Sequence, residues 1–359
     1  MEEEKKLYPL RFIPITDEYG WGREEFKLAD LGYRDSVIAE GWLGGNAISE
    51  VMDMYMDRVV GENVFEYYGR QFPYQVKLIR VNGRMPLRVH PEDEIASQRY
   101  DLLGKEKLWY VVSAGRDARL MIGFRKDTNA SEVYEKCLDS SISDIMNTIA
   151  PIEGKAYRIK PGTPHAASGE MLIAEVSESS PLDFCLCSWG EEVSPEEFDE
   201  SLNLVDAMDF IDYGRYSAPQ EDCGHHHGHD SILHKLVDIP QFTVNKAELH
   251  DPIHIYSEKF DSPFYYLCLK GEASVQVQIE GIGTAAHVLK EGQGILVPAE
   301  VPDFILAPLD KNTVLLETYL EKRESADPYI NPEAPEFTDD EDDGCEDEEC
   351  GCHHHHDHS

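Results

Sequence analysis

The stretch KPGTPHAASGEMLI, residues 160–173, combines a Gly/Pro turn, a Pro before a polar residue and an apolar strand. The stretch GQGILVPAEVPDFIL, residues 292–306, repeats this pattern, with Asp303 at the place of His165. Short apolar runs bounded by Gly and Pro are typical of strands in sandwiches and barrels. The repetition predicts two related β-barrels, of which only the first keeps a histidine at this turn.

Other short apolar runs extend this mainly β pattern through both halves of the chain. In the second half, Val275, Val277 and Ile279 alternate with glutamines, as expected of a half-buried strand. In the first half, strands bounded by turn-forming residues are predicted at 75–81, 108–114, 120–124 and 171–177.

Two segments of the first half have helical rather than strand periodicity. The run AISEVMDMYMD at residues 47–57 is typical of a helix. Residues 141–149 also place Ile142, Ile145 and Met146 at helical spacing. We therefore predict helical insertions that pack on the first barrel.

These patterns divide the chain into four segments. Residues 1–217 are predicted to form the first barrel with its helical insertions and to carry the pocket, and 234–325 to form the second barrel. Between them, 218–233 form a Cys/His-rich linker. The acidic, Cys/His-rich tail at 326–359 should be disordered, because its charges repel one another and few apolar side chains oppose this.

Composition limits the possible partners of the protein. A chain of 359 residues with 41% hydrophobic residues can bury the cores of two domains. Its net charge of −38 opposes non-specific binding to nucleic acids and anionic membranes, so neither is an expected partner. The N-terminus lacks the pattern of a secretory signal, and no apolar run approaches the roughly 18 residues of a membrane helix. These features predict a cytoplasmic protein.

Four of the eight cysteines lie in apolar or mixed segments. Cysteines in such segments usually behave as small buried hydrophobic residues. Buried thiols rather than disulfides are predicted at Cys137, Cys185, Cys187 and Cys268.

The segment PLRVHPEDE, residues 86–94, raises the question of a metal site. A histidine followed by proline and acidic residues is a common way for β-barrel enzymes to present a metal ligand. However, Arg88 lies two residues before His90, and side chains two apart on a strand project to the same side. The guanidinium would therefore repel a metal ion held by His90.

Several motifs resemble, in their order and spacing, those of the type I mannose-6-phosphate isomerases. The similarity runs over most of the first 325 residues. This resemblance implies a mainly β fold of two cupin (jelly-roll) barrels with helical inserts in the first, and zinc as cofactor. The matching segments are LYPLRF at 7–12, YGWG at 19–22, FPYQVKLIRVNGRMPLRVHPED at 72–93, GKEKLWYVV at 104–112 and PGTPHAASGEMLIAEVSESS at 161–180.

Five residues match functional positions of that family. The resemblance implies His90 and His165 as zinc ligands, and Lys105 and Glu175 as catalytic candidates. Trp21 stands at the family's opening tryptophan and becomes a candidate substrate contact, although its residue type alone favours a packing role.

Other positions depart from the family pattern. Arg88 replaces a glutamine ligand, Lys107 a glutamate ligand, Pro86 a small polar residue and Cys185 the arginine expected to act in catalysis. Glu106, next to Lys107, cannot replace the lost glutamate, because a shift of one residue points it to the opposite face of the strand.

These departures change the chemistry that the pocket can perform. A catalytic zinc normally needs about three protein ligands at ~2.0–2.3 Å, and a protonated Lys or Arg offers no lone pair. Arg88, Lys105 and Lys107 would instead make a basic hollow that binds a sugar phosphate or another anion. Alternatively, these three side chains extend to the barrel rim. Glu175 either pairs with them or faces solvent.

Three functional hypotheses follow. The first is a zinc-dependent aldose–ketose isomerase of carbohydrate metabolism that interconverts mannose 6-phosphate and fructose 6-phosphate. The second is a non-catalytic cupin that binds a sugar phosphate or another anion. The third is a metal-handling protein, because residues 223–230 and 345–359 combine thiols, imidazoles and carboxylates, which bind metal ions. The replaced ligand positions distinguish the first hypothesis from the second.

Overall fold

The structure is a computed structural model that describes residues 5–190, 204–217, 225–226, 231–279 and 283–321. The predicted tail at 326–359 lies outside these residues, as does most of the linker at 218–233. The described part is mainly β, and its strand ladders are antiparallel.

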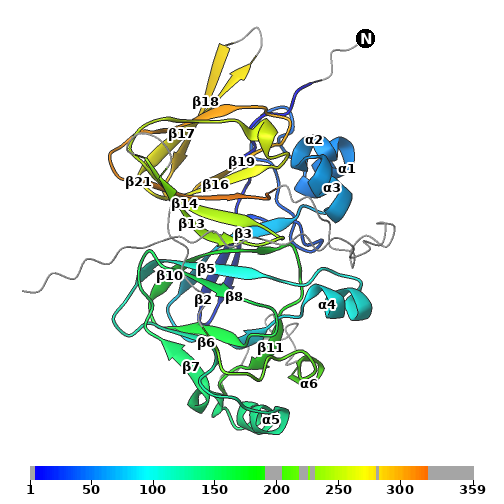
Figure 1. Cartoon of the computed structure of the whole chain (residues 1–359), viewed down its shortest axis with the longest axis vertical. Helices are drawn as coiled ribbons and strands as arrows, with labels where there is room; N and C mark the ends of the chain where they lie inside the picture. Colours follow the sequence, from blue (N-terminus) through cyan, green and yellow to red (C-terminus); the bar gives the residue numbers. More distant parts are fainter. Residues whose placement is uncertain (1–4, 191–203, 218–224, 227–230, 280–282, 322–359) are drawn as a thin grey trace, which may run out of the picture. The chain divides into compact units, whose positions relative to one another are not determined.

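The first barrel consists of two sheets that face each other (Figure 1). One sheet has the strand order β1 (Ile15–Tyr19), β2 (Gly22–Leu28), β3 (Tyr74–Val81), β10 (Met171–Glu178), β5 (Lys107–Ala114) and β8 (Ala156–Ile159). The other has the order β11 (Phe184–Cys187), β4 (Leu87–Val89), β9 (His165–Ser168), β6 (Arg119–Phe124) and β7 (Met146–Ile149). Apolar side chains from both sheets, among them Ile79, Val111, Leu120 and Ile122, form the core between them. The four strands predicted in this half are confirmed.

The second barrel repeats this topology. Its larger sheet has the order β12 (His225–His226), β13 (Ile232–Asp238), β14 (Thr243–Leu249), β21 (Thr313–Tyr319), β16 (Phe264–Lys270) and β19 (Gly294–Val297). Its smaller sheet has the order β15 (Ile253–Ile255), β20 (Phe304–Pro308), β17 (Glu272–Ile279) and β18 (Gly283–Lys290). His165 begins β9, and Asp303 immediately precedes the matching strand β20, as the repeated turn pattern predicted.

The two barrels share a hydrophobic core. Val76 on β3 and Leu267 on β16 both belong to it, so the outer faces of the two larger sheets pack together. Hydrogen bonds cross this contact: the Tyr74 hydroxyl donates to the Thr318 carbonyl, and the Tyr265 hydroxyl donates to the Lys27 carbonyl.

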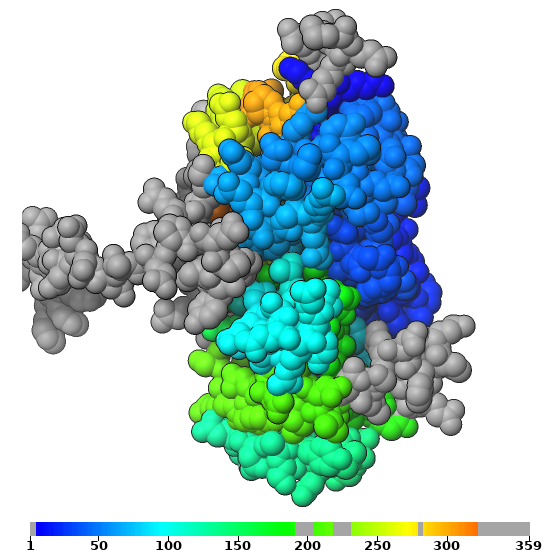
Figure 2. All heavy atoms as spheres, turned by 90° about the vertical axis from the view of Figure 1, so that its right-hand side faces the viewer, coloured from blue at the N-terminus to red at the C-terminus, as the bar shows by residue number. Residues whose placement is uncertain are grey.

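Three helices lie between β2 and β3 in the sequence: α1 (Ile48–Tyr55), α2 (Asp57–Val60) and α3 (Glu62–Tyr68). The predicted helix near Ile48 is therefore confirmed. These helices were expected on the first barrel, but they also lie against the second, where the blue and orange surfaces meet in Figure 2. Hydrogen bonds link them to that barrel. The Ala299 amide donates to the Val59 carbonyl, and Asp261 accepts from the Asn63 amide.

The other helices are α4 (Asp93–Tyr100), α5 (Ala130–Leu138) and α6 (Leu204–Ala207). The helix predicted at 141–149 is wrong: a 3₁₀ turn at Ile142–Asp144 leads into strand β7. Pairing of β7 with β6 overrides the helical spacing of the apolar residues.

Two further sequence predictions concern cysteines and membrane helices. The cysteines Cys137, Cys185, Cys187 and Cys268 are buried free thiols, as predicted. Within the described residues, no helix has the length and apolar character needed to cross a membrane.

Candidate functional site

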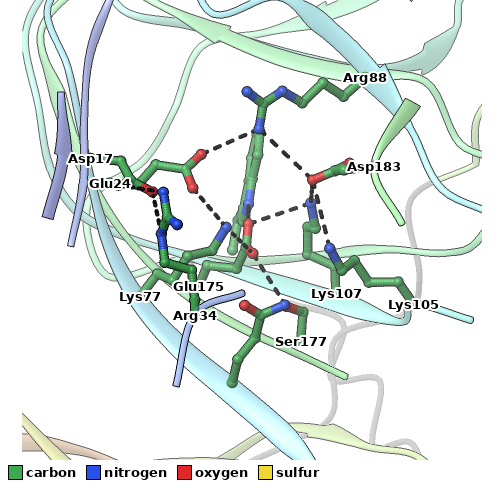
Figure 3. A network of polar contacts seen from close by, with 12 residues as sticks. Asp17, Glu24, Arg34, Lys77, Arg88, Lys105, Lys107, Glu175, Ser177 and Asp183 are labelled. Carbon is green, nitrogen blue, oxygen red and sulfur yellow. Dashed lines mark hydrogen bonds and ion pairs between the residues drawn. The ribbon is translucent and has the colours of Figure 1, made fainter. Parts of the chain in front are cut away.

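The candidate site is a set of charged side chains between the two sheets of the first barrel (Figure 3), all of them buried except Asp183, whose side chain is 15% exposed. It is called here the first-barrel charge network. It consists of the cations Lys77, Arg88, Lys105 and Lys107 and the carboxylates Glu24, Glu175 and Asp183.

Strand register places Glu175 at the centre of the network. On the larger sheet, Glu175 of β10 lies directly opposite Lys77 of β3 and Trp109 of β5. Its Oε1 is 3.1 Å from Lys77 Nζ, and its Oε2 accepts a hydrogen bond of 2.6 Å from the Trp109 indole. Burial alone would raise the pKa of Glu175, but attraction to Lys107 and Lys77 outweighs burial and holds the pKa below its usual range. Of the two orientations considered, Glu175 therefore takes the inward one.

Lys107, at the start of β5, joins the two sheets. Its Nζ lies 3.2 Å from Nε2 of His165, 3.5 Å from Oε2 of Glu175 and 3.6 Å from Oδ2 of Asp183. The side chain is only 2% exposed, so Lys107 does not extend to the barrel rim. An ammonium has three donors, and these three acceptors surround it.

The tautomer of His165 follows from its two neighbours. Nδ1 lies 3.0 Å from the Thr163 carbonyl oxygen, which can only accept, so Nδ1 carries the proton. Nε2 then presents its lone pair to the ammonium of Lys107. Burial and the charge of Lys107 lower the pKa of His165 to about 3, which keeps the ring neutral.

Asp183 precedes β11 and contacts three of the four cations. Its Oδ2 lies 3.8 Å from Arg88 Nη1, 3.7 Å from Lys105 Nζ and 3.6 Å from Lys107 Nζ. Burial opposes ionisation of Asp183, but these cations hold its pKa well below the usual range. Arg88 also contacts Glu24 of β2 at 3.3 Å. Arg88 therefore pairs with carboxylates from both sheets and is itself buried.

Lys105 has a pKa below the ordinary value of a lysine. Burial and repulsion from Lys107 lower its pKa to about 8, and attraction to Asp183 offsets only part of this effect. Lys105 can therefore lose or gain a proton near neutral pH, a property that suits a proton-transfer group.

His90 follows β4 and is fully buried. Its ring centroid is 5.1 Å from that of His165, so the structure brings the two predicted metal ligands together. Among the described residues, neither ring nitrogen has a hydrogen-bond partner. Burial and the nearby charge of Lys107 hold the pKa of His90 well below its usual range, so the ring is neutral.

The site does not fit a zinc ion. Among the described residues, no group of three His, Cys, Asp or Glu side chains is arranged to hold a metal. Lys107 and Arg88 cannot coordinate while protonated, and the lone pair of His165 faces the Lys107 ammonium. His90 and His165 alone fall short of the usual set of about three protein ligands.

The structure also places the remaining predicted positions. Trp21 is buried, stacks on Tyr19 with ring centroids 4.9 Å apart, and lies 5.9 Å from the Arg88 guanidinium. Glu106 points away from the network and contacts Arg158 at 2.6 Å, as the strand alternation predicted. Cys185 lies opposite Arg88 across the β4–β11 ladder.

Sequence reasoning missed three members of the network: Glu24, Lys77 and Asp183. A charged residue at an inward-facing position of an apolar strand was a usable signal for Lys77, which lies between Val76 and Leu78. The loop that carries Asp183 has no comparable pattern, because its position depends on the fold.

Comparisons with known proteins agree with this architecture. No protein-family profile matches the chain. Mannose-6-phosphate isomerase ManA of Bacillus subtilis is 23% identical over 320 residues, which cover 83% of this chain and 95% of the relative. Mannose-6-phosphate isomerase of Streptococcus mutans is 22% identical over 229 residues, covering 63% of this chain and 68% of the relative.

Solved structures of such enzymes share the fold. The mannose 6-phosphate isomerase structure from Bacillus subtilis superposes with a TM-score of 0.75 at 18% identity, covering 87% of this chain and 99% of that one. A zinc-bound mannose 6-phosphate isomerase gives a TM-score of 0.67 at 12% identity, with coverages of 88% and 100%. The chain is thus similar in sequence to mannose-6-phosphate isomerases and shares the fold of their solved structures.

Proposed function

We propose that this chain is a protein of carbohydrate metabolism whose first barrel takes a sugar phosphate of the mannose 6-phosphate and fructose 6-phosphate pair. The names of its relatives support this substrate class. The observation that carries the proposal is the charge of the first-barrel network. The network contains four cations and three carboxylates. Because both histidines are neutral, the network carries one excess positive charge. A phosphate ester, with a charge of roughly −1.5 to −2, complements such a site.

Isomerisation of the sugar is the first candidate activity. An aldose–ketose isomerase must move a proton between two neighbouring carbons. His90 is neutral with unpartnered ring nitrogens, and Lys105 titrates near neutral pH, so these two side chains are the groups best suited to that transfer. Glu175 is a weaker candidate, because its carboxylate is already engaged by Lys77 and Trp109. A solved relative binds zinc, but the residues of this site do not fit that metal, so we expect weak or no zinc-dependent turnover.

Binding of a sugar phosphate without turnover is the second candidate. The contact of Lys107 with His165, Glu175 and Asp183 favours it, because an ammonium stands among groups that could otherwise converge on a metal ion. The metal-handling hypothesis stays a prediction, since the Cys/His clusters at 223–230 and 345–359 fall almost wholly outside the described residues. A cytoplasmic location also stays a prediction.

The test combines a binding and a turnover measurement on the full chain. Mannose 6-phosphate is titrated calorimetrically, and its conversion to fructose 6-phosphate is followed with and without added zinc. Turnover of ~1–10³ per second would identify an isomerase. Binding that is lost in Lys107→Met but kept in Arg116→Gln would identify a binding protein. If wild-type protein neither binds nor converts the sugar phosphate, the proposal is wrong.

A further inference from the structure

A second polar cavity lies on the other face of the sheet that carries the charge network. Side chains alternate along a strand, so Glu24 of β2 and Lys77 of β3 face the network while their neighbours face away. Arg23, which precedes Glu24 on β2, and Arg80, three residues after Lys77 on β3, therefore face away from the network. Both line a cavity of about 460 Å³ that also involves residues of the second barrel.

The two arginines are placed against each other. Arg23 lies directly opposite Arg80 in the β2–β3 ladder, and like charges at such positions are destabilising. Among the described residues, Arg23 pairs with Glu18 at 4.0 Å, and these side chains are 42% and 71% exposed. Among the described residues, Arg80 has neither an ion pair nor a side-chain hydrogen bond. Within the described part of the chain, the pair therefore has a single ion pair, from Arg23 to Glu18, which leaves excess positive charge here in a chain of net charge −38.

The rest of the cavity supplies an apolar wall and little opposing charge. Lys27 contacts Glu25, so these two side chains neutralise each other. Of the acids that line the cavity, Glu291 is then left to oppose the charges of the two arginines. The apolar part of the lining consists of Pro14, Leu78, Val112, Leu172 and Leu269.

We propose that this cavity binds a small molecule that carries a phosphate monoester and a compact apolar body. Two guanidinium groups can each donate paired hydrogen bonds to phosphate oxygens, and a dianion neutralises both charges at once. The leucines Leu78 and Leu172 would cover the apolar body. This site is separate from the first-barrel charge network, because the two sets of side chains leave the sheet on opposite faces.

The test uses phenyl phosphate as the probe, titrated calorimetrically into the full chain. Wild-type protein should bind it, and Arg80→Gln and Arg23→Gln should each weaken binding at least tenfold. Arg116→Gln, which removes the same charge from an exposed turn outside the cavity, should leave affinity unchanged. Because Arg80→Gln removes a like-charge contact, its thermal midpoint without ligand should not fall.

A second variant assigns the binding to this cavity. Lys107→Met alters the first-barrel charge network and should retain phenyl phosphate affinity. The proposal is overturned if wild type does not bind the probe, or if Lys107→Met loses binding while Arg80→Gln keeps it. It is equally overturned if Arg116→Gln weakens binding as much as Arg80→Gln, because the interaction would then be non-specific attraction of an anion.

Discussion

Lys107 Nζ lies 3.2 Å from Nε2 of His165, and this contact engages the lone pair that His165 would otherwise offer to a metal ion. Because Nδ1 of His165 is held by the Thr163 carbonyl, Nε2 is the nitrogen with the lone pair. That lone pair accepts from an ammonium, and two carboxylates complete the surroundings of the same ammonium. A positively charged side chain thus stands where ligands for a metal ion would converge.

The first prediction concerns zinc. The double variant Arg88→Gln/Lys107→Glu replaces two cations by groups that can coordinate, next to His90 and His165. We expect it to retain one more equivalent of zinc than wild type after dialysis, measured by elemental analysis. Metal bound elsewhere, including the Cys/His-rich tail, is the same in both proteins and cancels. Equal zinc content would show that removing the cations is not enough to make a metal site.

The second prediction concerns the stability of the network. Glu175→Gln removes a buried charge that pairs with Lys77 and Lys107, and leaves those ammonium groups under-neutralised. We expect a loss of about 3–5 kcal/mol in the free energy of unfolding, measured by urea denaturation. Asp53→Asn, which breaks an exposed pair with Arg70, should cost less than about 1 kcal/mol. Similar small losses for both variants would contradict a tightly coupled network.

The third prediction concerns pH. The folded-state pKa of His165 is about 3, below the ordinary value of 6.5, so between these values the unfolded chain binds a proton that the folded chain does not. Stability must therefore fall as the pH is lowered from about 6.5 toward 3. From pH 6 to 5, wild type should lose up to about 1.4 kcal/mol more than His165→Gln. Parallel pH profiles of the two proteins in urea denaturation would show that His165 is protonated in the fold.

The fourth prediction concerns ligand-dependent stability. If mannose 6-phosphate binds the folded protein at the charge network, it should raise the thermal midpoint, by an amount equivalent to about 2.7 kcal/mol at 100 times its Kd. Lys107→Met should reduce the shift, and Arg116→Gln, which carries the same change of charge on the surface, should retain it. An unshifted midpoint in wild type at millimolar ligand would remove the support for this site as a sugar-phosphate pocket.

Much of the fold was predictable because its signals are local. The repeated turn at 160–173 and 292–306 correctly indicated two related barrels, since the turn and the following apolar strand are set by neighbouring residues. The same local reasoning failed at 141–149. There, the spacing of the apolar residues fits a helix as well as a strand. The pairing of β7 with β6 decided the conformation.

The candidate site was predictable only in part. Strand alternation correctly pointed Glu106 away from Lys107, because the side-chain period of a strand is local. No single segment of the sequence indicates which carboxylates neutralise the cations. Asp183 and Glu24 approach Arg88 from opposite sheets of the barrel, and only the facing of those sheets brings their charges within 4 Å. Burial then makes these ion pairs necessary, because an unpaired charge between the sheets would be too costly to keep.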